Sequence, residues 1–212
     1  RDALGEAGTQ TAALGFGGSG PTAATEEYNG SGWSNGGAMG TARRLLGGCG
    51  TQTAALGIGG YLDPGNTNAT EEYDGSAWTG GGNLGTTRRQ AAGLGILTAA
   101  LAAGGITTVA SNATEEYDGT SWTAGGNLNT ARSSLAGSGT QTAGLGFGGA
   151  TTVVVANTEE YDGSVWTAVN NMNTARQALG GSGSGTQTSS LAFGGTTGSV
   201  TAVTENYDGS TW

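Results

Sequence analysis

The sequence predicts an all-β protein made of five repeats, and three observations support this fold class. Variants of the unit in residues 130–166 recur along the whole chain, and each unit contains apolar residues at alternate positions, which is typical of strands with one packed face. Each unit also has an Asn-Gly or Asp-Gly dipeptide, which marks a tight turn. The closing tryptophans are 45, 44, 44 and 46 residues apart, at Trp33, Trp78, Trp122, Trp166 and Trp212. A fixed period of this length indicates a repeat architecture, and radial repetition of four-stranded antiparallel blades makes a five-bladed β-propeller.

Composition limits the classes of function. Glycine provides 45 of the 212 residues, and charged residues provide 11%, against ~25% in average proteins. The regularly spaced Leu, Tyr and Trp residues nevertheless indicate an ordered chain, because disordered segments are poor in aromatic residues. The net charge is −9 and arginine is the only basic residue type, which argues against a nucleic-acid or anionic-membrane surface. We expect no membrane insertion, since no apolar run approaches ~18 residues, and we expect Cys49 to be a small core residue.

The first half of each repeat predicts two strands. An arginine precedes a Gly/Ala-rich segment that we expect to be strand A, and glycine inside a strand indicates close approach of another backbone, as when five such strands converge on one axis. A polar Gly-Thr-Gln-Thr turn is predicted next, for example at residues 139–142, and is replaced in the third repeat by residues 95–98. Strand B then carries an apolar alternation, such as Leu145 and Phe147, that ends in two glycines.

The segment after strand B, here called the B–C loop, varies most between repeats. Counted from the second glycine to the threonine of strand C, it has 6, 9, 8, 8 and 8 residues. Binding residues concentrate on loops that a rigid scaffold positions. The B–C loops are therefore the predicted binding segments, and in an up-and-down blade they share one face with the links that join strand D to the next strand A.

The second half of each repeat predicts strands C and D. Strand C reads Thr-Glu-Glu-Tyr in four repeats and Thr-Glu-Asn-Tyr in the fifth, and strand D carries the tryptophan. We expect a type I′ hairpin between them, because Asp-Gly and Asn-Gly tolerate the positive φ that this turn needs. The predicted blades, 1 to 5, form a single domain 1–212 that we expect to be an excerpt of a longer chain; they cover approximately residues 1–40, 41–85, 86–129, 130–173 and 174–212.

The double glycine, the tyrosine some twelve residues later, the tryptophan five residues after that and the Asn-x-x-Thr-Ala-Arg link resemble the kelch repeat. The resemblance covers the whole chain and implies a kelch-like propeller. It departs from the family in its small strand A, its uniform Glu-Glu pair and a period shorter than the ~50 residues of kelch. The array also looks like repeat proteins of marine bacteriophages and environmental samples, which implies a tail-fibre or other virion role and a virion or extracellular location.

Residues repeated in every blade are first explained by the scaffold, so we predict no enzyme. The two glutamates of strand C are adjacent and should point to opposite faces of the sheet, whereas glycoside chemistry needs two carboxylates facing one bond. We expect the glutamates to pair with the arginine before strand A. The chain has no histidine, so it cannot build the copper site of some kelch enzymes. The Asp-Gly-Ser-x-Trp turn departs from the sialidase Asp-box, and a hairpin explains it without calcium; we predict no metal or cofactor.

Two groups of candidate ligand-binding residues follow. The first lies on the B–C loops: Tyr61, Asp63, Asn66, Thr151 and Thr152. The second is the set of arginines before strand A, which could form salt bridges or could ring one mouth of the central channel and hold an anion: Arg1, Arg43, Arg88, Arg132 and Arg176.

These residues predict a binding or structural module that attaches to a protein or a cell-surface receptor through its B–C loops, with other virion subunits as further partners. The alternative is a multivalent lectin with an equivalent glycan site in each blade.

Three structural expectations follow. Tyr117 and Trp122 should both be largely buried between adjacent blades, and Arg132 should lie within salt-bridge distance of a strand-C glutamate of its own or a neighbouring blade. If the five blades close on themselves, Trp212 should approach Arg1 within the reach of about nine residues, roughly 30 Å. An open arc, with those faces bare or covered by another chain, would instead indicate part of a larger ring or an assembly.

Overall fold

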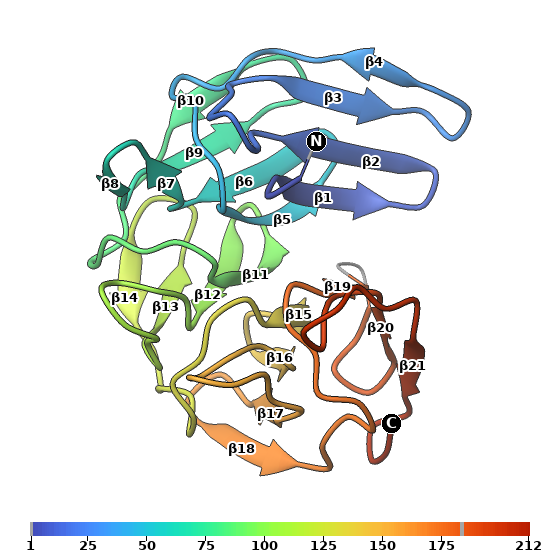
Figure 1. Cartoon of the computed structure of the whole chain (residues 1–212). Coiled ribbons are helices and arrows are strands. Elements are labelled where there is room, and N and C mark those ends of the chain that lie inside the picture. Colours follow the sequence, from blue (N-terminus) through green and yellow to red (C-terminus); the bar gives the residue numbers. More distant parts are fainter. Residues whose placement is uncertain (1, 183–184) are drawn as a thin grey trace.

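The computed structural model describes residues 2–182 and 185–212, and that part of the chain consists of strands, turns and loops. Five antiparallel sheets are arranged around a central axis as a five-bladed β-propeller, with the first strand of each sheet innermost (Figure 1). The all-β, five-bladed prediction is confirmed. The described residues contain no helix long and apolar enough to cross a membrane.

Four blades have the predicted four strands in up-and-down order, and the fifth has three strands among the described residues. Blade 1 contains β1 (Gly5–Thr9), β2 (Ala12–Phe16), β3 (Thr25–Tyr28) and β4 (Trp33–Asn35). Blade 2 contains β5 (Gly47–Thr51), β6 (Ala54–Ile58), β9 (Thr70–Tyr73) and β10 (Trp78–Gly80), with a small hairpin of β7 (Tyr61–Leu62) and β8 (Gly65–Asn66) in its B–C loop. Blade 3 contains β11 (Ala92–Ile96), β12 (Ala99–Ala103), β13 (Thr114–Tyr117) and β14 (Trp122–Ala124). Blade 4 contains β15 (Ala136–Thr140), β16 (Ala143–Phe147), β17 (Thr158–Tyr161) and β18 (Trp166–Val169). Blade 5 contains β19 (Gly180–Gly181), β20 (Ser190–Phe193) and β21 (Thr204–Tyr207).

Both predicted turns occur, but their lengths differ from the expectation. The A–B turn is shorter, because Gly139 and Thr140 still pair within β15; Gly139 has a φ of +96°, and a Cβ there would lie 2.2 Å from a carbonyl oxygen of β16. The C–D turn is longer than a type I′ hairpin, because Tyr161 pairs with Trp166 and four residues lie between them. Asp162 closes this turn, since its Oδ1 accepts hydrogen bonds from the backbone N–H groups of Ser164 and Val165 at 2.8 and 2.9 Å.

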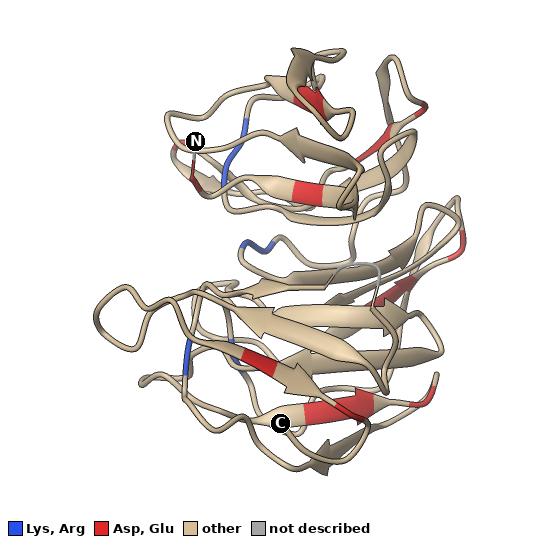
Figure 2. Cartoon of the chain, turned by 90° about the vertical axis from the view of Figure 1, so that its right-hand side faces the viewer, with Lys and Arg blue, Asp and Glu red and all other residues tan. Residues whose placement is uncertain are grey.

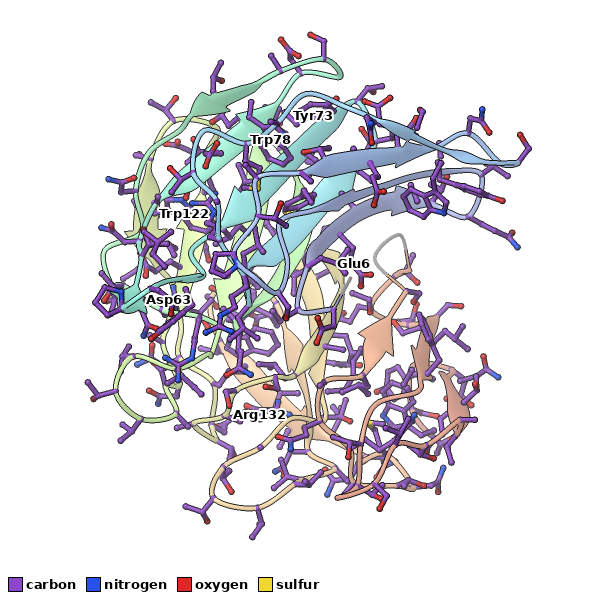
Figure 3. The ribbon with its side chains drawn as sticks, turned by 45° about the horizontal axis from the view of Figure 1, so that its top comes forward. Glu6, Asp63, Tyr73, Trp78, Trp122 and Arg132 are labelled. Carbon is purple, nitrogen blue, oxygen red and sulfur yellow. The ribbon has the colours of Figure 1, made fainter. Side chains whose placement is uncertain are left out.

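The core lies between blades, and the same side-chain contacts recur at each of the four interfaces along the chain. At each of these interfaces the tryptophan of the later blade donates its Nε1–H to the threonine of strand C in the preceding blade, as from Trp166 to Thr114 at 3.0 Å. The strand-C tyrosine of the later blade donates its O–H to the second glutamate of the preceding strand C, as from Tyr161 to Glu116. Tyr117 is fully buried as predicted, and Trp122 is partly buried, packed against the core cluster between blades 2 and 3. Figure 3 shows the Tyr73 and Trp78 rings side by side on blade 2, with their centroids 5.0 Å apart.

Backbone hydrogen bonds also join successive blades, just before each inner strand. The N–H of Ala178 donates to Ser134 O, that of Ser134 to Gln90 O, that of Gln90 to Leu45 O, and that of Leu45 to Ala3 O. All five residues have φ between 50° and 56°, a conformation in which each reaches the equivalent residue of the neighbouring blade. Among the described residues, no corresponding bond joins Ala3 to Ala178 and closes the circle.

The first and last blades do not meet as the other neighbours do. Figures 1 and 3 show an opening between them, whereas the other blades pack directly on each other. Trp33 of blade 1 is 57% exposed and Phe193 of blade 5 is 43% exposed, although their counterparts Trp166 and Phe147 are 5% and 0% exposed. This matches the open-arc expectation with bare end faces; the expected approach of Trp212 to Arg1 involves a residue outside the described part.

Candidate functional site at the B–C face

The arginines before strand A are structural in every blade where they are described. Arg132 is fully buried, and its Nη2 lies 2.9 Å from Glu159 Oε1, while its Nη1 donates to the carbonyl oxygens of Gly148 and Asn157 at 2.8 and 2.6 Å. The same ion pair joins Arg43 to Glu71, Arg88 to Glu115 and Arg176 to Glu205.

The predicted salt bridges are thus confirmed, whereas the ring at a channel mouth is wrong for Arg43, Arg88, Arg132 and Arg176, because all four lie inside their own blades. Arg1, the fifth candidate, lies outside the described residues. Burial lowers the pKa of Arg132 and the attraction of Glu159 opposes that shift. Each ion pair therefore connects the segment before strand A to strand C within one blade.

The two glutamates of strand C point in opposite directions, as predicted. In blade 4, Glu159 accepts from Arg132, while Glu160 accepts the O–H of Tyr207 in the next blade at 2.9 Å. Burial, followed by the hydrogen bond to the glutamate of the preceding blade, raises the pKa of Tyr117 and of Tyr161 to about 12. One carboxylate thus serves its own blade and the other serves the contact between blades.

The B–C face, formed by the B–C loops and the D–A links, holds a cluster of basic and aromatic side chains on blades 2 and 3. The ring of Tyr61, in β7, lies close to two guanidinium groups, with the Cζ of Arg44 at 5.1 Å and that of Arg89 at 5.3 Å from its centroid. Cations above aromatic faces at such distances are attracted by the ring quadrupole. Asp63 lies 3.6 Å from Arg44, and Figure 3 shows it at the outer edge of this face. We call these residues, together with Asn66, the arginine–tyrosine cluster.

The longest B–C loop folds so that this cluster is held in place. Tyr61 pairs with Asn66 in the β7–β8 hairpin, and the backbone of Tyr61 also bridges to Arg44. The side chain of Asn66 donates to the carbonyl oxygens of Ile106 and Thr107 in blade 3 and accepts from Arg89 at 2.8 Å. Asn66, predicted as a ligand residue, therefore positions Arg89 and anchors the loop across two blades.

The basic residues gather on one side of the propeller, whereas the acidic residues are spread more widely (Figure 2). The basic residues lie toward one side of the propeller in Figure 2, the side of the B–C loops and D–A links. The Asp-Gly turns lie at the opposite end of the strands, and hydrogen bonds from the turn backbone lower the pKa of their aspartates, to about 2 for Asp208. Within the described chain, Arg44 and Arg89 are the arginines outside the buried glutamate pairs. Both are partly exposed, so the arginine–tyrosine cluster holds partly exposed positive charge on a chain of net charge −9.

Sequence reasoning missed Arg44 and Arg89, although a signal was present. Both are the second residue of an Arg-Arg pair that occurs in repeats 2 and 3, while Ser133 and Gln177 stand at this position in repeats 4 and 5. A departure from the repeat at a position next to the variable loop marks a residue that the scaffold does not require.

Thr151 and Thr152, the other predicted loop residues, lie on the B–C loop of blade 4, where Thr151 is half-buried and Thr152 is exposed. Thr151 forms its hydrogen bonds with Val153 of the same loop. The structure does not bring these threonines into contact with Tyr61. Exposed valines project from the B–C loops of blades 3, 4 and 5, at Val109, Val153 and Val200, beside exposed threonine and serine residues.

The opposite end of the propeller contains the mouth of the central channel, a cavity of about 400 Å³. It is lined by the A–B turns of all five blades, mostly glycine and threonine, and Ile96 projects into it from blade 3. Buried Cys49, whose pKa is raised to about 12 by burial, belongs to the core as predicted. Within residues 2–182 and 185–212, no three His, Cys, Asp or Glu side chains are grouped as metal ligands would be.

No family model matches this chain, and no curated protein matches it. The geometry described above therefore supplies the functional argument.

Proposed function

We propose that this chain is a non-enzymatic binding module that attaches to a protein or receptor through its B–C face. The observation that carries the proposal is the arginine–tyrosine cluster, which departs from the repeat pattern and lies on the longest variable loop. Repeated residues such as Arg132 and Tyr117 are already engaged in the scaffold. Residues that differ between repeats are the ones free to serve a ligand.

The chemistry of the cluster favours a ligand that carries a carboxylate or another anionic group. Guanidinium groups match the planar geometry of carboxylates and can bind them through two parallel hydrogen bonds. Tyrosine is enriched at interfaces because it combines a large apolar ring with one polar group. The exposed valines of the neighbouring loops would contact an apolar part of the same ligand.

We further propose a kelch-like propeller acting on a virion or another extracellular surface. The repeat motif supports this assignment through the double glycine, the tyrosine and the tryptophan at kelch-like spacing. The ligand would then be an acidic group of a surface protein or a receptor glycan.

The lectin alternative requires equivalent sites in each blade. Aromatic rings are the usual sugar platforms, but Tyr73, Tyr117, Tyr161 and Tyr207 are buried between blades. A single ligand per chain would favour the B–C cluster, and about five per chain would favour the lectin.

The test uses the full chain on an array of neutral and carboxylate-bearing glycans and against a displayed library of random peptides. We expect selected ligands to carry carboxylates, to bind once per chain and to bind more weakly as salt rises. Arg44→Gln and Tyr61→Ala should each weaken binding at least about tenfold, which corresponds to ~1.4 kcal/mol. Ile96→Ala, an exposed apolar change at the channel mouth, is the matched control and should bind like the parent. Unchanged binding in both cluster variants would refute the proposal.

A further inference from the structure

We propose that the open seam, the facing surfaces of blade 5 and blade 1, is a docking site for one further blade of the same repeat type, supplied by a polypeptide segment that carries this repeat. The seam has two halves, each of which repeats one side of the interfaces inside the chain. The internal interfaces therefore specify what the occupant must present.

The blade 1 half lacks the partner that its counterparts have. Trp78 and Trp166 each donate to a threonine of the preceding blade, at 2.9 and 3.0 Å, and are 9% and 5% exposed. Trp33, which stands at the same position, is 57% exposed and contacts only the ring of Tyr28 from its own blade among the described aromatic side chains, at 5.2 Å. A hollow of about 340 Å³, lined by Leu4, Gly15, Glu26 and Trp33, lies on this surface.

The blade 5 half lacks the complementary partner. Phe16 and Phe147 are fully buried because each packs on a tryptophan of the next blade, with ring centroids 4.8 and 4.9 Å apart. Phe193 occupies the same position at the end of strand B and is 43% exposed. The threonine that would accept the hydrogen bond of the next tryptophan, Thr204, is also exposed, whereas Thr158 is buried.

The two halves do not satisfy each other in this structure. Among the described residues, no backbone hydrogen bond joins Ala3 to Ala178, although all four equivalent hydrogen bonds between the other blades are present. Figure 1 shows the two blades apart, and Figure 2, which faces this side of the molecule, shows the same separation. The exposed Trp33 and Phe193 rings agree with these views.

The shape of the seam favours one blade over a second copy of the whole chain. A second copy that docked its blade 1 on blade 5 would carry four more blades around the same axis, into the space that blade 1 already occupies. A single blade carries no further blades around the axis and so avoids that collision.

The occupant's chemistry follows from the repeat. Toward blade 1 it presents a threonine and a glutamate, which accept from Trp33 and Tyr28, and an apolar side chain that packs on Trp33. Toward blade 5 it presents a tryptophan that packs on Phe193 and donates to Thr204. Its tyrosine meets Asn206 in place of the glutamate found in the other blades, so it donates to an amide oxygen.

The test adds such a blade to the full chain. Residues 123–166, which run from one link through blade 4 to its tryptophan, are appended after Trp212 so that the repeat phase is kept. The readout is quenching of Trp33 by acrylamide, isolated as the difference between each chain and its Trp33→Phe variant. The matched control carries the same extension with alanine in the appended copy at the positions of Phe147, Thr158 and Glu160, the residues that would face Trp33 and Tyr28.

We expect the extension to reduce the quenching of Trp33 about sixfold, the ratio of its 57% exposure to the 9% of Trp78, in a chain that stays monomeric. The control extension should leave Trp33 quenchable. Equal quenching of Trp33 in the parent and extended chains would overturn the proposal. Protection of Trp33 in the monomeric parent would also overturn it, because the five blades would then close alone. Protection that appears only when the parent forms concentration-dependent dimers would overturn it too, because a second copy would then be the occupant.

Discussion

Replacing equivalent tryptophans in two blades should have very different effects on stability. Trp166 is buried against blade 3, where it donates to Thr114 at 3.0 Å and lies 5.0 Å from the ring of Tyr161. Trp33 holds the same repeat position but faces the open seam. Trp166→Ala and Trp33→Ala therefore remove the same atoms from two environments, and each serves as the other's control.

The expected difference follows from the exposed surface of the two residues. Trp166 is 5% exposed and Trp33 is 57% exposed, so about half of a tryptophan surface of ~250 Å² separates them. At ~25 cal/mol/Å², that area corresponds to ~3 kcal/mol. Truncation of a buried tryptophan typically costs ~3–5 kcal/mol. We therefore expect Trp166→Ala to lose ~4–5 kcal/mol of unfolding free energy and Trp33→Ala to lose ~1–2 kcal/mol.

The assay is urea denaturation of both variants and the parent, followed by circular dichroism so that the signal does not depend on the replaced tryptophan. The difference in midpoint, multiplied by the common slope, gives the change in free energy. Equal losses in the two variants would refute the reasoning, because they would mean that the first and last blades pack as the others do.

Three further predictions concern the scaffold. Arg132→Met should lower the free energy of unfolding by ~3–5 kcal/mol, because it leaves the buried carboxylate of Glu159 without its cation. The double variant with Glu159→Leu should recover most of that loss in the same urea assay, and a double variant no more stable than the single one would contradict the pairing. The raised pKa of Tyr117 means that the folded state favours the neutral phenol, so this stabilisation is complete below the ordinary pKa of ~10 and is lost as pH rises to about 12. The melting temperature of Tyr117→Phe should therefore fall less steeply than that of the parent over this pH range, and an equal slope in the two proteins would contradict the prediction. Gly126→Ala should lower the free energy of unfolding by ~1–3 kcal/mol or more, because its Cβ would lie 1.9 Å from a carbonyl oxygen of the next blade. Gly80→Ala has no atom within 4 Å of the added Cβ and should change the melting temperature little, and similar effects in both variants would show that the blades do not approach closely at Gly126.

The fold could be predicted from the sequence because the same signals occur five times. The period of the tryptophans, the alternation in strand B and the turn dipeptides all indicate the same blade. Turn lengths were less predictable, since Asp162 closes a four-residue loop with its side chain where the dipeptide alone indicated a two-residue hairpin. Local propensity identifies a turn, whereas the register of the flanking strands fixes its length.

The candidate site was only partly predictable. Tyr61 and Asp63 were identified from the length and chemistry of their loop, and they do lie in the arginine–tyrosine cluster. Arg44 and Arg89 were not, because their approach to Tyr61 depends on the contact between two blades and on the anchoring of Asn66 in blade 3. The open seam was likewise stated only as one of two outcomes, since a repeat pattern gives the contacts between neighbours and not the angle at which they accumulate around the axis.

The central claim is that repeated residues build the scaffold and that function lies where the repeats differ. The most direct test is a substitution library of the full chain displayed on yeast, sorted once for protease resistance and once for binding to the glycan or peptide selected in the screen above. We predict that substitutions which abolish binding without loss of protease resistance concentrate at residues 44, 61, 63, 66 and 89. A distribution over equivalent positions of all five blades, or around the channel mouth, would contradict the claim.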